Sequence, residues 1–263
     1  MLIDSHCHIH EIDYPLDINE VVARAKKSGV MQIICVGSNQ TSSREALNIA
    51  LSHDGLFASI GVHPHYAKDG IGDLVDLIES ADKSKLVAIG EIGLDYHYKH
   101  SSHEVQIQML KQQIKLAIKY DLPIIFHVRE AYDDFWPIID EFLSCGYKLR
   151  GVLHSFSDTL INAQEGIKRG LYIGVNGIST FTKDESQKIM FKSIPVERLL
   201  LETDAPFLVP NPLRGKVKTN EPAFIKEIAE YNCLLYQISF DEFSNITTSN
   251  ANALFVLKSK KAI

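Results

Sequence analysis

Two histidines near the N-terminus have a spacing that suits a metal ion. His6 and His8 flank Cys7 in the segment DSHCHIH. In an extended strand, residues i and i+2 point to the same side, so both imidazoles face one way and Cys7 faces the other. Two convergent imidazoles are good ligands for a divalent transition metal. The pair alone does not distinguish a metal site from ordinary packing.

Further histidines and carboxylates stand where apolar runs end. Glu91 follows LVAIG, His127 follows PIIF, His154 follows GVL and Asp204 follows LLLET. Burying so many ionisable groups together without a cation would be costly, through desolvation and mutual repulsion. We therefore expect these groups and the N-terminal histidine pair to gather around bound metal, two ions rather than one.

The elements that must carry these residues alternate along the chain. Short apolar runs rich in β-branched residues predict parallel strands buried on both faces, and the amphipathic stretches between them predict helices. The expected strands span residues 1–8, 32–38, 57–64, 86–93, 123–129, 151–156, 171–176 and 199–204. The expected helices span residues 18–28, 41–52, 71–82, 102–120, 130–144, 158–169, 183–193 and 222–236.

This alternation predicts an α/β fold, a single (β/α)8 TIM-type barrel over residues 1–263. A doubly wound open sheet alternates in the same way, so the strand count only favours the barrel. Barrel enzymes keep their active sites at the carboxyl ends of the strands. The histidines and carboxylates described above fall at those ends, and no Pro/Gly/Ser-rich linker divides the chain.

Composition bears on the kind of partner and the cellular compartment. The chain of 263 residues is 45% hydrophobic and 23% charged, as globular proteins are. Its net charge of −6 argues against a broad basic face for nucleic acid or an anionic membrane. Without a signal peptide or an apolar run of about 18 residues, we expect a cytoplasmic protein. Four separated cysteines predict buried, reduced thiols, and the C-terminal KSKKA predicts a solvated tail.

Several motifs together resemble the TatD family of metal-dependent deoxyribonucleases, within the amidohydrolase-like barrels. The resemblance runs through nearly the whole sequence, in DSHCHIH, GVHPH, IGEIGLDY, PIIFHVREA, LHSFS, LLLETDAPFL, NEP and SNANALF. It implies a two-metal site whose ligands are His6, His8, Glu91, His127, His154 and Asp204.

The resemblance also implies which of these ligands would hold which metal ion. One ion would be held by the N-terminal histidine pair with Asp204, the other by His127 and His154, with Glu91 bridging both. Lowering the pKa of bound water toward about 7 would supply hydroxide as the nucleophile. Asp204 is the expected proton acceptor, so it and Glu91 are the catalytic candidates, while Glu202 is either a supporting partner or a salt-bridge residue. The resemblance favours Zn or Mg, whereas mixed His and carboxylate ligands also suit Mn, Ni or Fe.

Substrate-binding residues are expected at the same rim. His63 and His65 follow the third strand, Arg129 ends the fifth, and Arg214 lies in the long segment 207–222. A loop of this length in a compact domain is more often functional than idle. Its basic residues fit phosphate contacts and a solvated charge cluster equally well.

Other polar and aromatic residues are weaker candidates. Asp95 and Tyr96 follow the strand of the glutamate and could support the site, and Asn220 with Glu221 could fix the long loop. His10 would over-supply one metal. Trp136 and the phenylalanines are expected to pack in the core or on the surface rather than stack on bases.

The first functional hypothesis is a DNA phosphodiesterase, a 3′–5′ exonuclease, needing neither a membrane nor an obligate protein partner. The alternative is an amide, lactone or aminoacyl-ester hydrolase with the same site. A neutral amide gains nothing from Arg214, Lys216 and Lys218, so these loop cations discriminate between the two. The third hypothesis, a metal-binding scaffold without activity, does not account for a full set of ligands.

Overall fold

The computed structural model describes residues 1–257, and its strands form one parallel sheet in the chain order β1 to β8. The strands are β1 (Leu2–Cys7), β2 (Val30–Val36), β3 (Leu56–Ile60), β4 (Leu86–Asp95), β5 (Ile124–Arg129), β6 (Gly151–Leu153), β7 (Tyr172–Val175) and β8 (Leu199–Leu201). All of the expected strands are confirmed, although β3, β6 and β8 end three or four residues before the predicted bounds.

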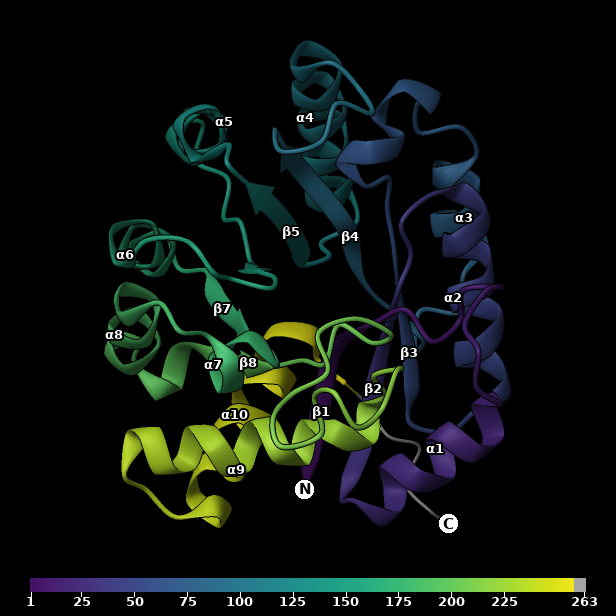
Figure 1. The fold of residues 1–263 in the computed structure, drawn as a ribbon. Helices are drawn as coiled ribbons and strands as arrows, with labels where there is room; N and C mark the ends of the chain where they lie inside the picture. The colour runs from purple at the N-terminus through teal and green to yellow at the C-terminus, as the bar shows by residue number, and fades with distance from the viewer. Residues whose placement is uncertain (258–263) are drawn as a thin grey trace.

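Helices follow the strands and surround them (Figure 1). They are α1 (Ile18–Lys27), α2 (Gln40–Ser52), α3 (Leu74–Ser80), α4 (His103–Lys119), α5 (Tyr132–Ser144), α6 (Leu160–Lys168), α7 (Ile178–Phe181), α8 (Glu185–Ser193), α9 (Ile225–Tyr236) and α10 (Phe240–Phe255). Short 3₁₀ turns are η1 (Pro64–Asp69), η2 (Val196–Arg198) and η3 (Pro222–Phe224). Side-chain caps such as Asp17 on α1 and Thr159 on α6 satisfy free backbone N–H groups where these helices begin.

The sheet curls into the expected TIM-type barrel, with the ends of β1 and β8 brought together. Cys7 forms a parallel bridge with Ala205, just beyond β8. The backbone N–H of His8 donates to the carbonyl of Ala205 over 2.7 Å, and that of Asp204 donates to the carbonyl of His6 over 2.9 Å. This seam joins the first and last strands and sets the predicted ligands of both beside each other.

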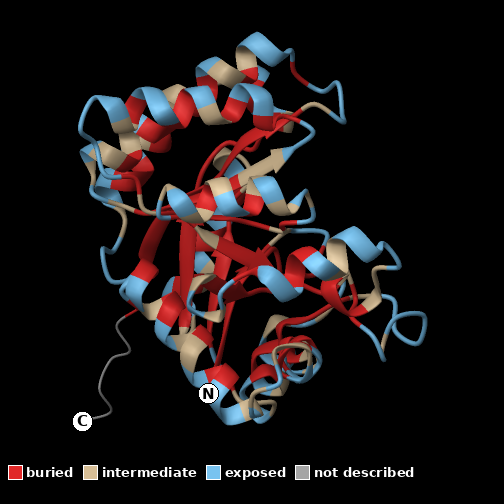
Figure 2. Cartoon of the chain, turned by 90° about the vertical axis from the view of Figure 1, so that its left-hand side faces the viewer, coloured by how far each residue is buried: buried red, intermediate tan, exposed pale blue. Residues whose placement is uncertain are grey.

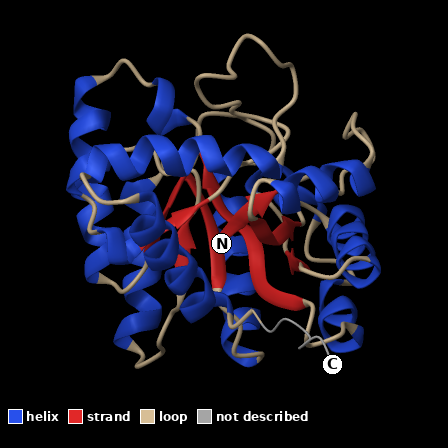
Figure 3. Cartoon of the chain, turned by 90° about the horizontal axis from the view of Figure 1, so that it is seen from below, coloured by secondary structure: helices blue, strands red, loops and turns tan. Residues whose placement is uncertain are grey.

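The barrel interior is a packed core, closed at one end by a helix. Apolar side chains from β1 to β6 and β8 pack against Ala251, Leu254 and Phe255 of α10. The strands are buried and the outward helix faces are exposed, as Figure 2 shows by colour. Figure 3 shows the ring of helices around the sheet from below. Since Ile3, Val87 and Leu200 of this cluster lie near the strand starts, α10 closes the amino end and leaves the carboxyl end for chemistry.

The structure corrects several details. Helix α10 lies where the sequence predicted none, because its run FDEFSNITTSNANALF is rich in weak helix formers and gains its stability from packing. Cys145 is exposed rather than buried, while the other three cysteines are buried and free. The KSKKA tail lies outside the described residues. Among residues 1–257 no helix has the length and apolar character needed to cross a membrane, and the cellular location stays a prediction.

Gly93 allows β4 and β5 to approach closely beside the site. Its φ is +158°, and a Cβ there would lie 1.7 Å from the carbonyl oxygen of His127. Gly170 also has positive φ, +84°, but a Cβ would meet nothing within 4 Å. Gly93 pairs in register with His127, so the glycine sets the spacing between the two strands that carry Glu91 and His127.

Replacing Gly93 by alanine should therefore destabilise the fold far more than the same change at Gly170. We expect Gly170→Ala to lower the free energy of unfolding by about 1–2 kcal/mol, the cost of left-handed backbone alone. Gly93→Ala should cost more than about 4 kcal/mol or prevent folding, because two backbones must separate. Urea unfolding monitored by circular dichroism measures both, and equal losses would contradict this role for Gly93.

Candidate active site

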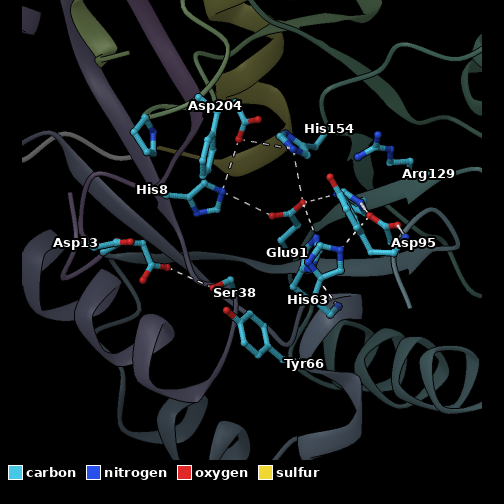
Figure 4. A pocket seen from close by; sticks show the side chains of 16 residues that line it. His8, Asp13, Ser38, His63, Tyr66, Glu91, Asp95, Arg129, His154 and Asp204 are labelled. Carbon is cyan, nitrogen blue, oxygen red and sulfur yellow. Dashed lines mark hydrogen bonds and ion pairs between the residues drawn. The ribbon is translucent and has the colours of Figure 1, made fainter. Parts of the chain in front are cut away.

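A cavity of about 560 Å³ opens at the carboxyl ends of the strands (Figure 4). Its size is typical of small-molecule and cofactor sites. Of the six predicted metal ligands, all but His6 line it, and His6 is fully buried against them. The sequence-predicted cluster therefore exists as one assembly of side chains, drawn from β1, β4, β5 and the segments that follow β1, β6 and β8.

The first group of donor atoms surrounds a point between β1 and β8. His6 Nε2 and His8 Nε2 lie 3.1 Å apart. His6 Nε2 lies 3.6 Å from Glu91 Oε2 and 3.7 Å from Asp204 Oδ1. His8 Nε2 lies 3.7 Å and 3.6 Å from the same two oxygens. Four donors from distant parts of the chain thus face one another at nearly equal separations.

The second group surrounds the other oxygen of the same carboxylate. Glu91 Oε1 lies 2.8 Å from His127 Nδ1 and 3.6 Å from both His154 Nε2 and His63 Nε2. Glu91 is thereby shared, with Oε2 toward the N-terminal histidine pair and Oε1 toward the histidine on β5 and those that follow β3 and β6. Figure 4 shows Glu91 at the centre of these contacts.

Hydrogen bonds on the outer side of the rings assign their tautomers. His8 Nδ1 donates to the backbone carbonyl of Val36 over 2.8 Å, because a carbonyl only accepts. His127 Nε2 donates to Asp95 Oδ2 over 2.9 Å, and His154 Nδ1 lies 3.0 Å from Glu202 Oε1. These outer contacts leave Nε2 of His8, Nδ1 of His127 and Nε2 of His154 facing the centre, the orientation that metal-ligating histidines show.

His63 has the opposite tautomer. Its Nδ1 accepts from the backbone N–H of His65 over 3.1 Å, so Nε2 carries the proton. Burial lowers the pKa of His63 well below its usual range, and the ring is neutral. His63 therefore presents an N–H donor to the cavity and suits an anionic oxygen better than a metal ion.

The charges of the site call for a cation. Burial raises the pKa of Asp204 to about 6. Burial alone would lower the pKa of His154, but neighbouring carboxylates, led by Glu202, outweigh it and raise that pKa to about 10. Burial would also raise the pKa of Glu91, yet the surrounding imidazoles hold it well below its usual range. The carboxylates thus attract positive charge to a place where water is largely excluded.

The donor atoms fit a divalent metal. A tetrahedral set of ligands at about 2.0–2.2 Å from an ion has donor atoms about 3.3–3.6 Å apart. In the first group the donor separations run from 3.1 Å between His6 and His8 to 3.7 Å between His8 and Glu91. Mixed imidazole and carboxylate donors suit Zn, Mn, Fe or Ni. His6 Nδ1 has no hydrogen-bond partner, so this ring lacks the outer hydrogen bond that His8 and His127 make.

The predicted substrate residues are only partly brought together. His63, His65 and Arg129 line the cavity. Arg214 lies outside this lining, and its guanidinium carbon lies 3.9 Å from the ring centre of Phe181. The other basic residues of that loop are exposed and also outside the lining.

The structure places the other candidate residues Tyr96, Asn220 and His10 outside the cavity lining. Tyr96 donates its hydroxyl to Asp134 and takes no part in the cavity lining. Asn220 donates through Nδ2 to the carbonyls of Thr203 and Phe207, which ties the long loop to the segment after β8. His10 is buried against Ser42, 3.0 Å away, and is absent from the cavity lining.

Asp95 does more than the sequence indicated. Its Oδ2 accepts from His127 Nε2 and lies 3.2 Å from His65 Nε2, while Oδ1 accepts from the backbone N–H of His97 and of Tyr98. These hydrogen bonds outweigh burial and hold the pKa of Asp95 well below its usual range. The sequence signal was its position, four residues after Glu91 on the same strand, which places both side chains on one face.

Comparison with known proteins decides the family. The family model "TatD related DNase" matches residues 3–256. The chain belongs to the TatD family. It is 39% identical to the metal-dependent hydrolase YabD of Bacillus subtilis over 97% of this chain and 99% of that protein. It is 33% identical to the "3'-5' ssDNA/RNA exonuclease TatD" of Erwinia tasmaniensis over 97% of this chain and all of that protein.

A solved structure agrees with the fold. The TatD homologue YJJV of Escherichia coli superposes with a TM-score of 0.88 at 29% identity, covering 98% of each chain. The barrel and the family predicted from the sequence are thus confirmed. This TatD protein belongs among metal-dependent hydrolases, in agreement with the donor set at its cavity.

Asp95→Asn should weaken metal binding through the tautomer of His127. In this variant the backbone N–H groups of His97 and Tyr98 still donate to the oxygen of the new side-chain amide, so the amide NH₂ faces His127 Nε2. Nε2 must then accept a hydrogen bond, which places the ring proton on Nδ1. A protonated Nδ1 cannot ligate. We expect metal affinity to fall by roughly 10–100-fold, as for other outer partners of ligating histidines.

Competition with a chromogenic chelator measures this affinity. Glu130→Gln is the matched control, because Glu130 contacts His97 over 2.8 Å at an exposed position. Unchanged affinity in Asp95→Asn, or an equal loss in both variants, would show that Asp95 does not set the tautomer.

Proposed function

We propose that this protein is a metal-dependent hydrolase that cleaves phosphodiester bonds in DNA from the 3′ end, with residues 1–263 acting as one catalytic domain. The carrying observation is the shared carboxylate of Glu91, with one oxygen toward each group of imidazoles. TatD-family membership and a relative named as a 3'-5' ssDNA/RNA exonuclease support the substrate class.

We propose two divalent ions per chain. His6, His8 and Asp204 would hold one ion. His127 on β5 and His154 after β6 would hold the other. Glu91 would bridge the two. The family resemblance favours Zn or Mg, and the mixed donor set would also accept Mn, Ni or Fe. Bound ions would acidify water and neutralise charge that builds on phosphoryl oxygens.

The protein's own groups supply the remaining steps. Asp204 turns Oδ1 toward the first donor group, and its carboxylate orients the attacking water and accepts the proton that the water loses. His63 donates its Nε2–H to a non-bridging phosphate oxygen. Arg129, exposed at the rim, pairs with the phosphate backbone of the bound strand. The leaving hydroxyl group departs with a proton from solvent.

Chelation of metal should abolish hydrolysis and lower the melting temperature, and adding back metal should restore both. Asp204→Asn should lower kcat on end-labelled single-stranded DNA by about 100-fold or more, the usual contribution of a proton acceptor. Asp13→Asn, at an exposed cavity carboxylate outside both donor groups, should stay within about threefold of wild type. Full activity in chelator with less than one metal ion per chain would sink the proposal.

Arg129 and Arg214 should differ in their effects on DNA. Arg129→Ala should raise KM for an oligonucleotide by roughly tenfold and reduce the slope of log affinity against log salt by about 1. Arg214→Ala should leave both nearly unchanged, because Arg214 lies outside the cavity.

A panel of neutral amides, lactones and aminoacyl esters tests the alternative substrate class. Arg129→Ala should hydrolyse these neutral compounds as fast as wild type does. Faster turnover of such a compound than of DNA, without any dependence on Arg129, would favour the alternative over the nuclease.

A further inference from the structure

Three large aromatic side chains stand exposed at the mouth of the cavity. Tyr66, Tyr98 and Phe207 all line it, with 41%, 45% and 59% of their surface exposed. Large rings are among the costliest side chains to leave in water, and a group of them at one cavity marks a binding surface. No role in the metal centre or in proton transfer falls to any of the three.

Phe207 is held beside the proposed proton acceptor. Its backbone N–H donates to the carbonyl of Asp204 over 2.9 Å, and its own carbonyl accepts from Asn220 Nδ2 over 2.5 Å. Within residues 1–257 no aromatic ring or cation stacks on the Phe207 ring. The backbone is thus fixed while the ring is left free for another flat surface.

Tyr98 and Tyr66 are held on the other side of the centre. The backbone N–H of Tyr98 donates to Asp95 Oδ1 over 3.0 Å, and the Arg129 guanidinium carbon lies 5.2 Å from the ring centre. Tyr66 donates its backbone N–H to the carbonyl of His63 over 2.9 Å. Figure 4 shows Asp204 above Glu91, Asp95 to its right and Tyr66 below it. Because the backbone of Phe207 is hydrogen-bonded to Asp204 and that of Tyr98 to Asp95, these aromatic residues flank the reactive centre.

Exposed rings interleaved with a cation are the features by which proteins hold single-stranded nucleic acid. Bases stack on the rings while the cation tracks the phosphate backbone. Arg129 beside Tyr98 supplies that pairing here. A small amide or lactone has no flat aromatic surface that would use rings on both sides of the centre.

We propose that Phe207 on one side, and Tyr98 with Tyr66 on the other, bind the nucleobases that flank the scissile phosphate. The proposal rests on the nuclease function argued above and assigns its base-binding site. Stacking is indifferent to the sugar, so the site accepts bases of DNA and of RNA. Specificity for a strand with unpaired bases follows, because paired bases within a duplex have no free faces to offer.

The test compares normal and abasic strands. Four proteins are assayed: wild type, Phe207→Ala, Tyr98→Ala and the conservative Tyr98→Phe. The first substrate is a single-stranded DNA of about 12 nucleotides. The second is the same strand with its last two nucleotides abasic. An RNA strand of the same sequence is a third substrate. Tyr147→Ala is the matched control, because Tyr147 is 47% exposed and lies outside this cavity, at a separate and smaller hollow beside the end of α4.

Each alanine change at the mouth should raise KM on normal DNA and RNA by roughly 5- to 150-fold, with a smaller change in kcat. On the abasic strand the same variants should match wild type, and Tyr98→Phe should match it on every substrate. Equal losses on normal and abasic strands, or no loss on either, would overturn the base-binding site while leaving the nuclease function intact.

Binding gives a readout that needs no turnover. The metal-loaded protein is titrated with fluorescein-labelled, phosphorothioate-linked strands, and anisotropy reports the dissociation constant. Wild type should bind the normal strand more tightly than the abasic one, and Phe207→Ala should erase most of that difference. Equal affinity of wild type for both strands would refute the proposal even if the protein proves to hydrolyse another substrate.

Discussion

Glu91 holds one negative charge between two sets of imidazoles, and the site is arranged around that carboxylate. It is almost completely buried, so its charge is supported by neighbours rather than by water. Its two oxygens face different strands of the barrel. A buried carboxylate in this position would destabilise a core without cations, whereas cations on either side stabilise its negative charge.

The barrel supplies what the carboxylate needs. The seam between β1 and the segment after β8 sets Asp204 beside the N-terminal histidines through backbone hydrogen bonds. Gly93 allows the strand of Glu91 to lie against that of His127. Outside the ligands, the Val36 carbonyl and the Asp95 carboxylate accept hydrogen bonds from the outer nitrogens of two rings. Glu202 forms an ion pair with the outer nitrogen of His154, 3.0 Å away. The reactive geometry thus depends on groups that never touch substrate.

The sequence predicted the strands and the gathering of six distant side chains because both follow strong rules. Parallel strands of a barrel are continuous apolar runs, and their carboxyl ends meet at one face. The tautomers were not predictable, since the partner of His63 is a backbone N–H in a turn and that of His8 is a carbonyl on another strand. These contacts exist only once the chain has folded.

Three other features of the structure could not be predicted from the sequence, again for physical reasons. The contact of Arg214 was not predictable, because a guanidinium can lie over an aromatic ring as readily as it pairs with a phosphate, and that of Arg214 lies over the ring of Phe181. The phenylalanines were expected to pack, and Phe207 instead stands exposed at the cavity mouth, where the tether to Asn220 holds it. Helix α10 was missed because tertiary packing, rather than intrinsic propensity, makes it a helix.

Anomalous X-ray diffraction from crystals of the metal-loaded protein tests the central claim most directly. The account predicts two peaks about 3.5–4 Å apart, one on the Oε2 side of Glu91 near the N-terminal histidines and one on the Oε1 side. A single peak away from Glu91, or none at full loading, would contradict it.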